Sequence, residues 1–156
     1  MKTAVIFYSL DGNCALVAKT IKTQLNADMI RLQTKDEKKR KGIVKFFWAF
    51  GMVFKKRPKL KQYTFDPSAY DLIVIGTPVW ASNYASPMKT FFADTPITGK
   101  KVALFACHAS EKGNTLENMK TLLKENTIIG EIDFLNAAKN WEEVKPKLES
   151  WIKGLE

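Results

Sequence analysis

Residues 3–21 read TAVIFYSLDGNCALVAKTI, and this stretch decides the fold of the chain. Ala4–Tyr8 is a short apolar run of strand-forming residues, and Ser9–Asn13 consists almost entirely of turn residues. Ala15–Ile21 then has the apolar spacing of a helix. A strand, a tight loop and a helix in this order direct backbone N–H groups and the positive end of a helix at one place, which is typical of a phosphate site. An ordinary strand-to-helix turn is the alternative.

The composition is that of a globular chain. It has 156 residues, of which 46% are apolar and 26% charged, enough for one domain that buries about two-thirds of its unfolded surface. No apolar run approaches the roughly 20 residues of a membrane-spanning helix, and the N-terminus lacks a signal-peptide pattern. Two cysteines are too few for a disulfide framework, and no cysteine–histidine spacing indicates a metal. We expect one cytoplasmic domain, residues 1–156, without a metal site.

The positive charge is concentrated in one segment. The chain has 25 Lys and Arg residues against 16 Asp and Glu residues, a net charge of +9. Residues 35–61 contain 11 of these basic residues and only two of the acidic ones, so the rest of the chain nets zero. The segment 35–61 is therefore predicted to be a basic and aromatic insertion in a neutral domain.

Strand and helix patterns alternate along the remaining chain. Four further runs are typical of strands: 28–32, 71–76, 101–107 and 128–135. Three further patterns are typical of helices: from Pro87 onward, 115–124, and 141–155, the last containing a Pro146 that is expected to kink or delay it. Five strands alternating with helices predict an α/β fold, an open parallel sheet with helices on both faces.

Three polar or aromatic loops follow strands of this predicted sheet. They are Ser9–Cys14, Thr77–Ser86 and Cys107–Asn114. In open parallel sheets, ligands bind beyond the carboxyl ends of the strands, where the strand order reverses. We therefore expect these three loops to form one crevice.

Two motifs, in this order, resemble the flavodoxin family. The phosphate loop of that family reads Ser/Thr-x-Thr-Gly-Asn-Thr, and this chain has Ser9-Leu10-Asp11-Gly12-Asn13-Cys14 after its first predicted strand. The stretches Tyr70–Trp80 and Ser86–Phe91 also resemble the sequences of flavodoxin-like flavoproteins at the corresponding positions. The resemblance covers the chain apart from the insertion. It implies a three-layer α/β/α sandwich, a five-stranded parallel sheet in the order 2-1-3-4-5, and FMN in the crevice.

The resemblance also implies which residues contact FMN, with its phosphate on the first loop and its ring between the other two. The cofactor-binding residues implied are Ser9, Leu10, Asp11, Gly12, Asn13, Cys14, Thr77, Pro78, Val79, Trp80, Asn83, Tyr84, Cys107, His108, Ala109 and Gly113. Trp80 is expected to stack on the ring, with a core tryptophan as the alternative. Tyr84 is expected either to stack or to cover the loop. No catalytic acid or base is predicted, because a flavin itself supplies the redox chemistry.

Two positions of the phosphate loop depart from the family pattern. Asp11 stands where the family has a threonine, and an ionised carboxylate cannot donate to a phosphate and repels its charge. Cys14 replaces a second hydroxyl with a weak donor. Gly12, Asn13 and the backbone amides remain as the centre of an anion site. The alternative is therefore that this chain is a relative of the flavodoxins that binds no flavin or binds FMN weakly.

Three side chains at the predicted crevice have more than one interpretation. His108, the only histidine, either contacts the flavin edge near N1 or O2, or is a solvated loop residue. Cys14 lies at a predicted helix N-terminus, which can lower a thiol pKa. We nevertheless expect Cys14 to be a buried packing residue, because no base adjoins it in the sequence. Cys107 ends an apolar strand and is expected to be inert.

The predicted function is electron transfer by an FMN-binding protein, with a redox partner protein or a quinone-like small molecule as partner. The alternatives are an FMN-dependent oxidoreductase, of the quinone reductase or protoporphyrinogen-oxidase type, and a flavin-free binding module. Typical flavodoxins are acidic, so the basic charge of this chain counts against a standard shuttle. A receiver domain needs paired acids where this chain has Tyr8-Ser9, and a nicotinamide Rossmann domain needs a G-x-G-x-x-G that is missing here.

The insertion contains an apolar and aromatic run, residues 42–54, between two basic clusters. As a helix this run would be apolar all round, and such a helix is buried or meets a partner. One interpretation is a second crossover helix that packs on the sheet. The other is contact of residues 38–61 with an acidic partner or, peripherally, with a membrane surface, since basic flanks and aromatics are typical of such segments. Nucleic acid is disfavoured, because the rest of the chain lacks supporting basic residues.

Overall fold

The computed structural model describes residues 1–36, 47, 51 and 57–156. The strands are β1 (Thr3–Tyr8), β2 (Asp28–Leu32), β3 (Leu72–Trp80), β4 (Asn83–Tyr84), β5 (Lys101–His108) and β6 (Thr127–Leu135). The helices are α1 (Asn13–Leu25), α3 (Ser86–Asp94), α4 (Thr115–Leu122) and α5 (Trp141–Lys153), with a short 3-10 turn at Pro67–Ala69. The predicted alternation of strands and helices is confirmed. Pro146 lies inside α5 without delaying its start at Trp141.

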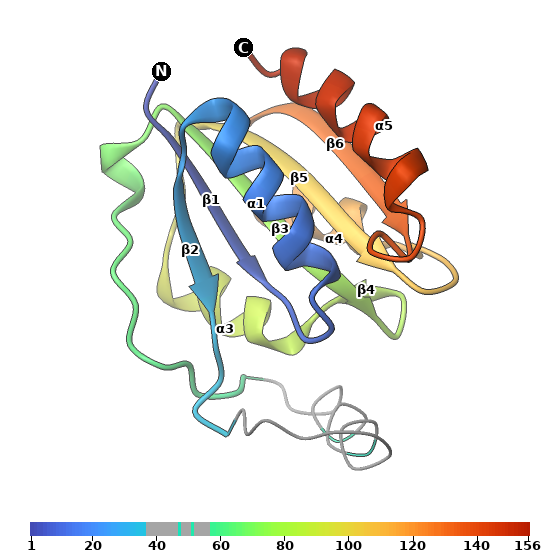
Figure 1. Ribbon diagram of the computed structural model, residues 1–156. Coiled ribbons are helices and arrows are strands. Elements are labelled where there is room, and N and C mark those ends of the chain that lie inside the picture. The colour runs from blue at the N-terminus through green and yellow to red at the C-terminus, as the bar shows by residue number, and fades with distance from the viewer. Residues whose placement is uncertain (37–46, 48–50, 52–56) are drawn as a thin grey trace.

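Five parallel strands form the sheet in the order β2-β1-β3-β5-β6. Counted as parallel strands alone, this is the predicted order 2-1-3-4-5. Figure 1 shows α1 and α5 on one face of the sheet and α3 and α4 on the other, so the three-layer sandwich is confirmed. The order reverses between β1 and β3, which places the switch point, and hence the expected ligand site, at their carboxyl ends.

The β3–β4 hairpin differs from the predicted loop over Thr77–Ser86. β3 runs on to Trp80, and the chain turns back so that Trp80 pairs with Asn83. Both turn residues, Ala81 and Ser82, have positive φ angles of 49° and 59°. Such a turn matches the twist of the flanking strands, which is why two-residue hairpins favour it. The sequence did not predict this turn, because neither Ala81 nor Ser82 is the Gly or Asn that such turns usually contain.

The central strands are buried on both faces, as their continuous apolar sequence predicts. Along β1, Val5 and Phe7 pack against α1 and α5, whereas Ile6 and Tyr8 pack against α3 and α4. Gly76, at the centre of the sheet, pairs with Phe105 of β5, and the Phe105 ring fills the space that a side chain on Gly76 would need. The core therefore has two halves, one on each side of the sheet.

The connection between β2 and β3 is the least regular part of the fold. Thr34 and Leu60 form an isolated antiparallel bridge, so the described ends of the insertion lie side by side. After this bridge the chain is extended, and Tyr63 and Phe65 pack near Phe91 of α3, with ring centroids 6.4 and 6.0 Å away. The predicted run 42–54 lies outside the described residues apart from Phe47 and Gly51, and its two interpretations stay predictions.

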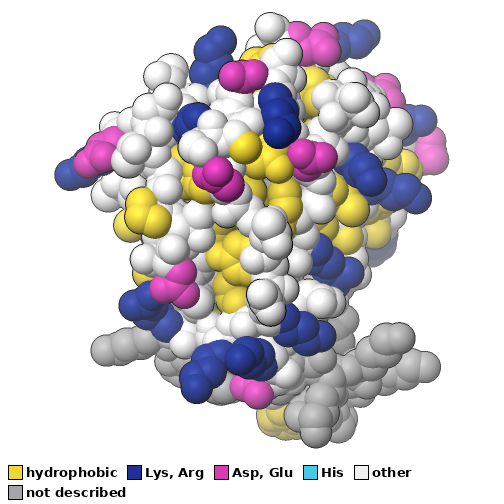
Figure 2. Space-filling view, turned by 90° about the vertical axis from the view of Figure 1, so that its left-hand side faces the viewer, with side chains coloured by type: hydrophobic (Ala, Val, Ile, Leu, Met, Phe, Trp, Pro, Cys, Tyr) yellow, Lys and Arg dark blue, Asp and Glu magenta, His cyan; other side chains and the backbone are white. Residues whose placement is uncertain are grey.

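The base of the insertion is basic. Figure 2 shows Lys and Arg side chains gathered where the insertion joins the domain. One depression at this base is lined by four basic residues, Lys35, Arg57, Lys59 and Lys61. Arg57 forms an ion pair of 2.6 Å with Asp94 of α3. Within the part of the chain that the structure describes, no helix is long and apolar enough to cross a membrane.

Candidate functional site

The carboxyl ends of β1, β3 and β5 open into a cavity of about 190 Å³. It is lined by Ser9, Leu10, Asp11, Asn13, Cys14, Pro78, Val79, Trp80, Cys107, His108, Ala109 and Asn136. The structure thus brings together the three loops that the sequence placed at one crevice. All of the lining residues except Asn136 were among the predicted cofactor-binding residues.

The first loop places several hydrogen-bond donors at the start of α1. Gly12, the N-cap, has a φ angle of 90°, in the left-handed region that residues with a side chain rarely adopt. The hydroxyl of Ser9 accepts the N–H of Ala15 at 3.2 Å. Asn13 accepts the N–H of Ala138 at 2.8 Å through its side-chain oxygen, which leaves the amide N–H groups as donors. The first N–H groups of a helix, together with these donors, can hold a phosphate.

The two unusual residues of this loop have different surroundings. Asp11 is exposed at the edge of the cavity. Cys14 is buried, and burial, the neighbouring Cys107 and the carboxylate of Asp11 raise the pKa of its thiol well above the usual value. A neutral buried thiol is a poor nucleophile. The structure therefore supports the packing role predicted for Cys14, and Cys107 lies beside it in the same part of the core.

Trp80 lies at the cavity and not deep in the core. Its ring is partly buried and meets the ring of Tyr8 edge-on, with centroids 5.6 Å apart and an interplanar angle of 84°. This edge-to-face contact with Tyr8 helps to hold the Trp80 indole in position. Stacking of Trp80 on a flavin ring stays a prediction.

His108 is held in a network of charged groups. Its side chain is only 9% exposed, and its Nε2 lies 2.9 Å from Asp133 of β6. The other carboxylate oxygen of Asp133 accepts a hydrogen bond of 3.0 Å from Lys112. Burial disfavours the charged form of Asp133, but the hydrogen bonds from His108 and Lys112 outweigh burial and lower its pKa. The alternative of a solvated loop histidine is therefore wrong.

Sequence reasoning missed two residues of this site, Asp133 and Asn136. Asp133 was counted only as part of the last predicted strand. Its pairing with Ala106, two residues before His108 on β5, places it on the same face of the sheet as His108, to which it bonds. Asn136 follows that strand in a left-handed conformation, with φ of 44°, and donates its N–H to the carbonyl of His108 at 2.7 Å. The sequence did carry one indication of this turn, because Asn136 directly follows the strand pattern and asparagine tolerates the left-handed conformation.

Some predicted residues support the loops instead of lining the cavity. Five of the predicted cofactor-binding residues do not line the cavity: Gly12, Thr77, Asn83, Tyr84 and Gly113. The buried hydroxyl of Thr77 accepts the N–H of Ala85 at 3.0 Å, which holds the end of the hairpin. Asn83 accepts a hydrogen bond of 3.1 Å from Asn118 of α4, which ties the hairpin to that helix.

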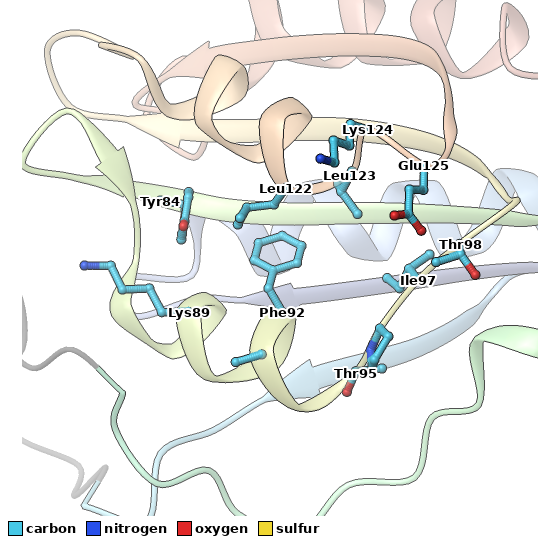
Figure 3. A pocket seen from close by; sticks show the side chains of 12 residues that line it. Tyr84, Lys89, Phe92, Thr95, Ile97, Thr98, Leu122, Leu123, Lys124 and Glu125 are labelled. Carbon is cyan, nitrogen blue, oxygen red and sulfur yellow. The ribbon is translucent and has the colours of Figure 1, made fainter.

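Tyr84 lines a separate pocket between α3 and α4, of about 380 Å³. Figure 3 shows the ring of Phe92 pointing toward Leu122 in this pocket, with Tyr84 beside them. The Tyr84 and Phe92 rings meet edge-on at 5.6 Å. Burial raises the pKa of the Tyr84 hydroxyl. Tyr84 therefore packs the hairpin onto α3, which agrees with its predicted covering role better than with stacking.

Gly113 is expected to control the spacing of the two loops beside the cavity. Its φ angle is 55°, and a Cβ atom there would lie 2.5 Å from Cβ and 2.7 Å from Cα of Ser82. Gly113→Ala should therefore both strain the backbone, by about 1–2 kcal/mol, and push the hairpin away. Gly99→Ala is the matched control, because Gly99 also has a positive φ, of 66°, but nothing within 4 Å. We expect both variants to lower the free energy of unfolding in urea, with the larger loss at Gly113; equal losses would contradict this role.

Comparison with known proteins agrees with this fold. No curated protein sequence matches the chain. A flavoprotein from Lactobacillus acidophilus, solved in complex with FMN, is 22% identical over 90% of this chain and 98% of its own, with a TM-score of 0.70. The Megasphaera elsdenii flavodoxin is 20% identical over 97% and 99% of the two chains, with a TM-score of 0.63. An NADH:FMN oxidoreductase is 12% identical over 99% and 88%, with a TM-score of 0.64. The sequence profile described as Flavodoxin matches residues 2–154, and the chain therefore belongs to the flavodoxin family.

Proposed function

We propose that the chain binds FMN in the cavity at the carboxyl ends of β1, β3 and β5 and acts in electron transfer. The observation that carries the proposal is the meeting of a helix N-terminus and an aromatic side chain at one cavity, at the point where the strand order reverses. Membership of the flavodoxin family supports FMN as the ligand. The Lactobacillus acidophilus structure contains FMN in the same fold, which adds support.

The residues present fit FMN at both of its ends. Ser9, Asn13 and the first turn of α1 can hold the phosphate, and Trp80 and His108 border the space left for the ring. The cavity of about 190 Å³ is smaller than the roughly 300–1,000 Å³ of pockets that enclose a drug-sized ligand. FMN would therefore be only partly enclosed. When bound, FMN would supply the redox chemistry, while the chain binds and orients it and excludes water from one side.

Titration of the purified chain with FMN tests the proposal directly. We expect the flavin fluorescence to be quenched at micromolar concentrations, with one FMN bound per chain. Riboflavin, which lacks the phosphate, should bind more weakly, because it leaves the anion site at α1 empty. Absence of quenching by FMN at micromolar concentrations would overturn the proposal and favour the flavin-free binding module.

Asp11 is expected to weaken the binding of FMN. Its carboxylate is exposed at the cavity edge, where a phosphate dianion would be repelled. Asp11→Asn should tighten FMN binding about fivefold at low salt, and Asp11→Thr somewhat more because a hydroxyl can donate. The gain should shrink as salt is raised, since exposed charges are screened. An unchanged affinity of both variants at low salt would show that the carboxylate points away from the phosphate.

An FMN-dependent oxidoreductase is the second candidate function. The observation that favours it is the likeness to a solved NADH:FMN oxidoreductase, together with a net charge of +9 that is unusual for a shuttle. Rapid oxidation of NADH or NADPH by the FMN-loaded protein would support the enzyme. Slow turnover with fast electron exchange to a partner protein would support the shuttle.

The partners are also proposals. A redox protein or a quinone-like small molecule suits a flavin that is only partly enclosed. Contact of residues 38–61 with an acidic partner or a membrane surface rests on their sequence and on the basic depression that Arg57, Lys59 and Lys61 line. Co-sedimentation with anionic and neutral vesicles, at low and high salt, tests the membrane contact. Protein that stays in the supernatant with anionic vesicles at low salt would exclude it.

A further inference from the structure

Three lysines share one face of the short two-stranded ribbon at the base of the insertion. Thr34 and Leu60 form an antiparallel bridge, which places Lys35 opposite Lys59. Two backbone hydrogen bonds hold this register: Lys35 donates to the carbonyl of Lys59 at 2.9 Å, and Lys61 donates to the residue before Thr34 at 2.7 Å. Side chains alternate along extended chains, so Lys35, Lys59 and Lys61 lie on one face of the ribbon. We call these three residues the lysine face.

The burial of the ribbon residues agrees with this assignment. Thr34 is buried, and Leu60 packs against the half of the core on the α3 and α4 side of the sheet. The three lysines are exposed and line the depression at the base of the insertion, which has a volume of about 640 Å³. Thr90 of α3, itself buried, donates its hydroxyl to the carbonyl of Pro58 at 2.7 Å and so anchors the ribbon. The lysine face therefore combines exposed charges with an anchored backbone.

The positive charge of the lysine face is not balanced within the part of the chain that the structure describes. No described residue forms an ion pair with Lys35, Lys59 or Lys61. The neighbouring Arg57 is already paired with Asp94, at 2.6 Å. Like charges directly opposite each other in a ladder are destabilising, so the Lys35–Lys59 pair costs stability in the free protein. Carboxylates of a bound partner would offset this cost.

The lysine face lies at the same edge of the sheet as the cavity proposed for FMN. β1 and β2 are parallel neighbours, Tyr8 pairs with Leu32 at their carboxyl ends, and the ribbon begins directly after Leu32. Figure 1 shows both strands ending at this edge. Arg31 of β2 donates a hydrogen bond of 2.8 Å to the carbonyl of Ser9, which ties the end of β2 to the first loop of the cavity. A protein bound at the lysine face would therefore lie close to the flavin.

We propose, on the basis of the proposed function, that the lysine face is the docking surface for an acidic electron-transfer protein. Charge identifies the partner, because the lysines attract carboxylates and the chain outside residues 35–61 has no net charge to oppose them. Shape favours a protein over a lipid surface, because the lysines line a depression. A protruding acidic loop can enter a depression, whereas a planar bilayer cannot follow it.

Binding of an acidic [2Fe–2S] ferredoxin, used as the probe, tests the docking surface before FMN is added. Isothermal titration should detect binding at low salt, and high salt should weaken it. Lys59→Glu should weaken binding at low salt about tenfold. Lys147→Glu is the matched control, because Lys147 is exposed on α5, on the other face of the sheet from α3. Equal weakening by the two substitutions, or no binding by the wild-type chain, would overturn the proposal.

Lys35→Gln separates docking from folding. Because it removes the like charge opposite Lys59, the midpoint of urea unfolding should rise while ferredoxin binding weakens. A midpoint that falls would contradict the opposed-charge pair and assign Lys35 a structural role. Vesicles of phosphatidylglycerol test the lipid alternative. Vesicle binding that is lost in Lys59→Glu, without any binding of ferredoxin, would assign the lysine face to a membrane and overturn the proposal.

The FMN-loaded chain then tests whether docking serves electron transfer. Reduced ferredoxin is mixed with the oxidised complex, and two ferredoxins give one electron each to the cofactor, which takes its protons from water. We expect Lys59→Glu to slow the bleaching of flavin absorbance about tenfold at low salt and little at high salt. An unchanged rate at low salt would show that bound ferredoxin does not deliver electrons from this face. Failure of FMN to bind would overturn only the proposed function, because the ferredoxin titration does not need FMN.

Discussion

Gly76→Ala is expected to lower the free energy of unfolding by about 3 kcal/mol, the upper end of the cost of overpacking a core. A Cβ atom on Gly76 would lie 1.9, 2.3 and 2.5 Å from three atoms of the Phe105 ring. Phe105 is fully buried, and Gly76 pairs with Phe7 on one side and Phe105 on the other. The ring therefore has no free space into which it can move. Urea unfolding followed by circular dichroism measures the loss.

A second substitution tests whether the Phe105 ring is the cause. Phe105→Leu alone should destabilise the protein by leaving a small cavity. In the double variant with Gly76→Ala, the smaller side chain should accommodate the new methyl group. We expect the double variant to lose less stability than the sum of the two single losses, since contacting residues couple. Additive losses, or a Gly76→Ala protein as stable as wild type, would contradict the close packing of Gly76 on Phe105.

Trp80→Ala is expected to weaken FMN binding about tenfold or more. Stacking of a planar heterocycle on an aromatic side chain is worth roughly 1–3 kcal/mol. Trp80 lines the cavity, and its contact with Tyr8 holds the indole in place. Trp80→Phe should recover part of the affinity, because it keeps an aromatic face. Fluorescence titration with FMN measures both variants.

The same experiment tests the alternative for Trp80. If Trp80 were only a packing residue, both variants would change stability and leave the affinity for FMN near that of wild type. Urea unfolding of each variant separates the two effects. A stable Trp80→Ala protein that binds FMN as tightly as wild type would place the stacking elsewhere. In that case Trp80 would belong to the core with Tyr8.

The placement of the charge excess has a consequence for function. The domain outside residues 35–61 has a net charge of zero, whereas typical flavodoxins are acidic, and four described basic residues of the segment line one depression at its base. Complementary charge raises the rate at which partners meet and does so most at low salt. The proposed partner surface should therefore be acidic, and its association should slow as salt increases.

Local patterns in the sequence determined the elements of this fold. Apolar runs and helical spacing predicted the five parallel strands and the four described helices, because periodicity reports which side of an element faces the core. The resemblance to flavodoxins supplied the strand order. The meeting of three loops at one crevice followed from the rule that ligands bind at the carboxyl ends of the strands in open parallel sheets. The turn at Ser9–Asn13 between β1 and α1 was also predictable, because Ser, Asp, Gly and Asn between a strand pattern and a helix pattern are typical of such turns.

Only the tertiary structure decided which side chains meet. Asp133 bonds His108 from 25 residues away, and Asn13 bonds the backbone of Ala138 from 125 residues away. The close contact of Gly76 with Phe105 likewise depends on the register of β3 and β5. Periodicity assigns a residue to a face but not to a neighbour, since register and partner are set by how separate elements pack together. The loops of the site were therefore predictable, whereas the network around His108 was not.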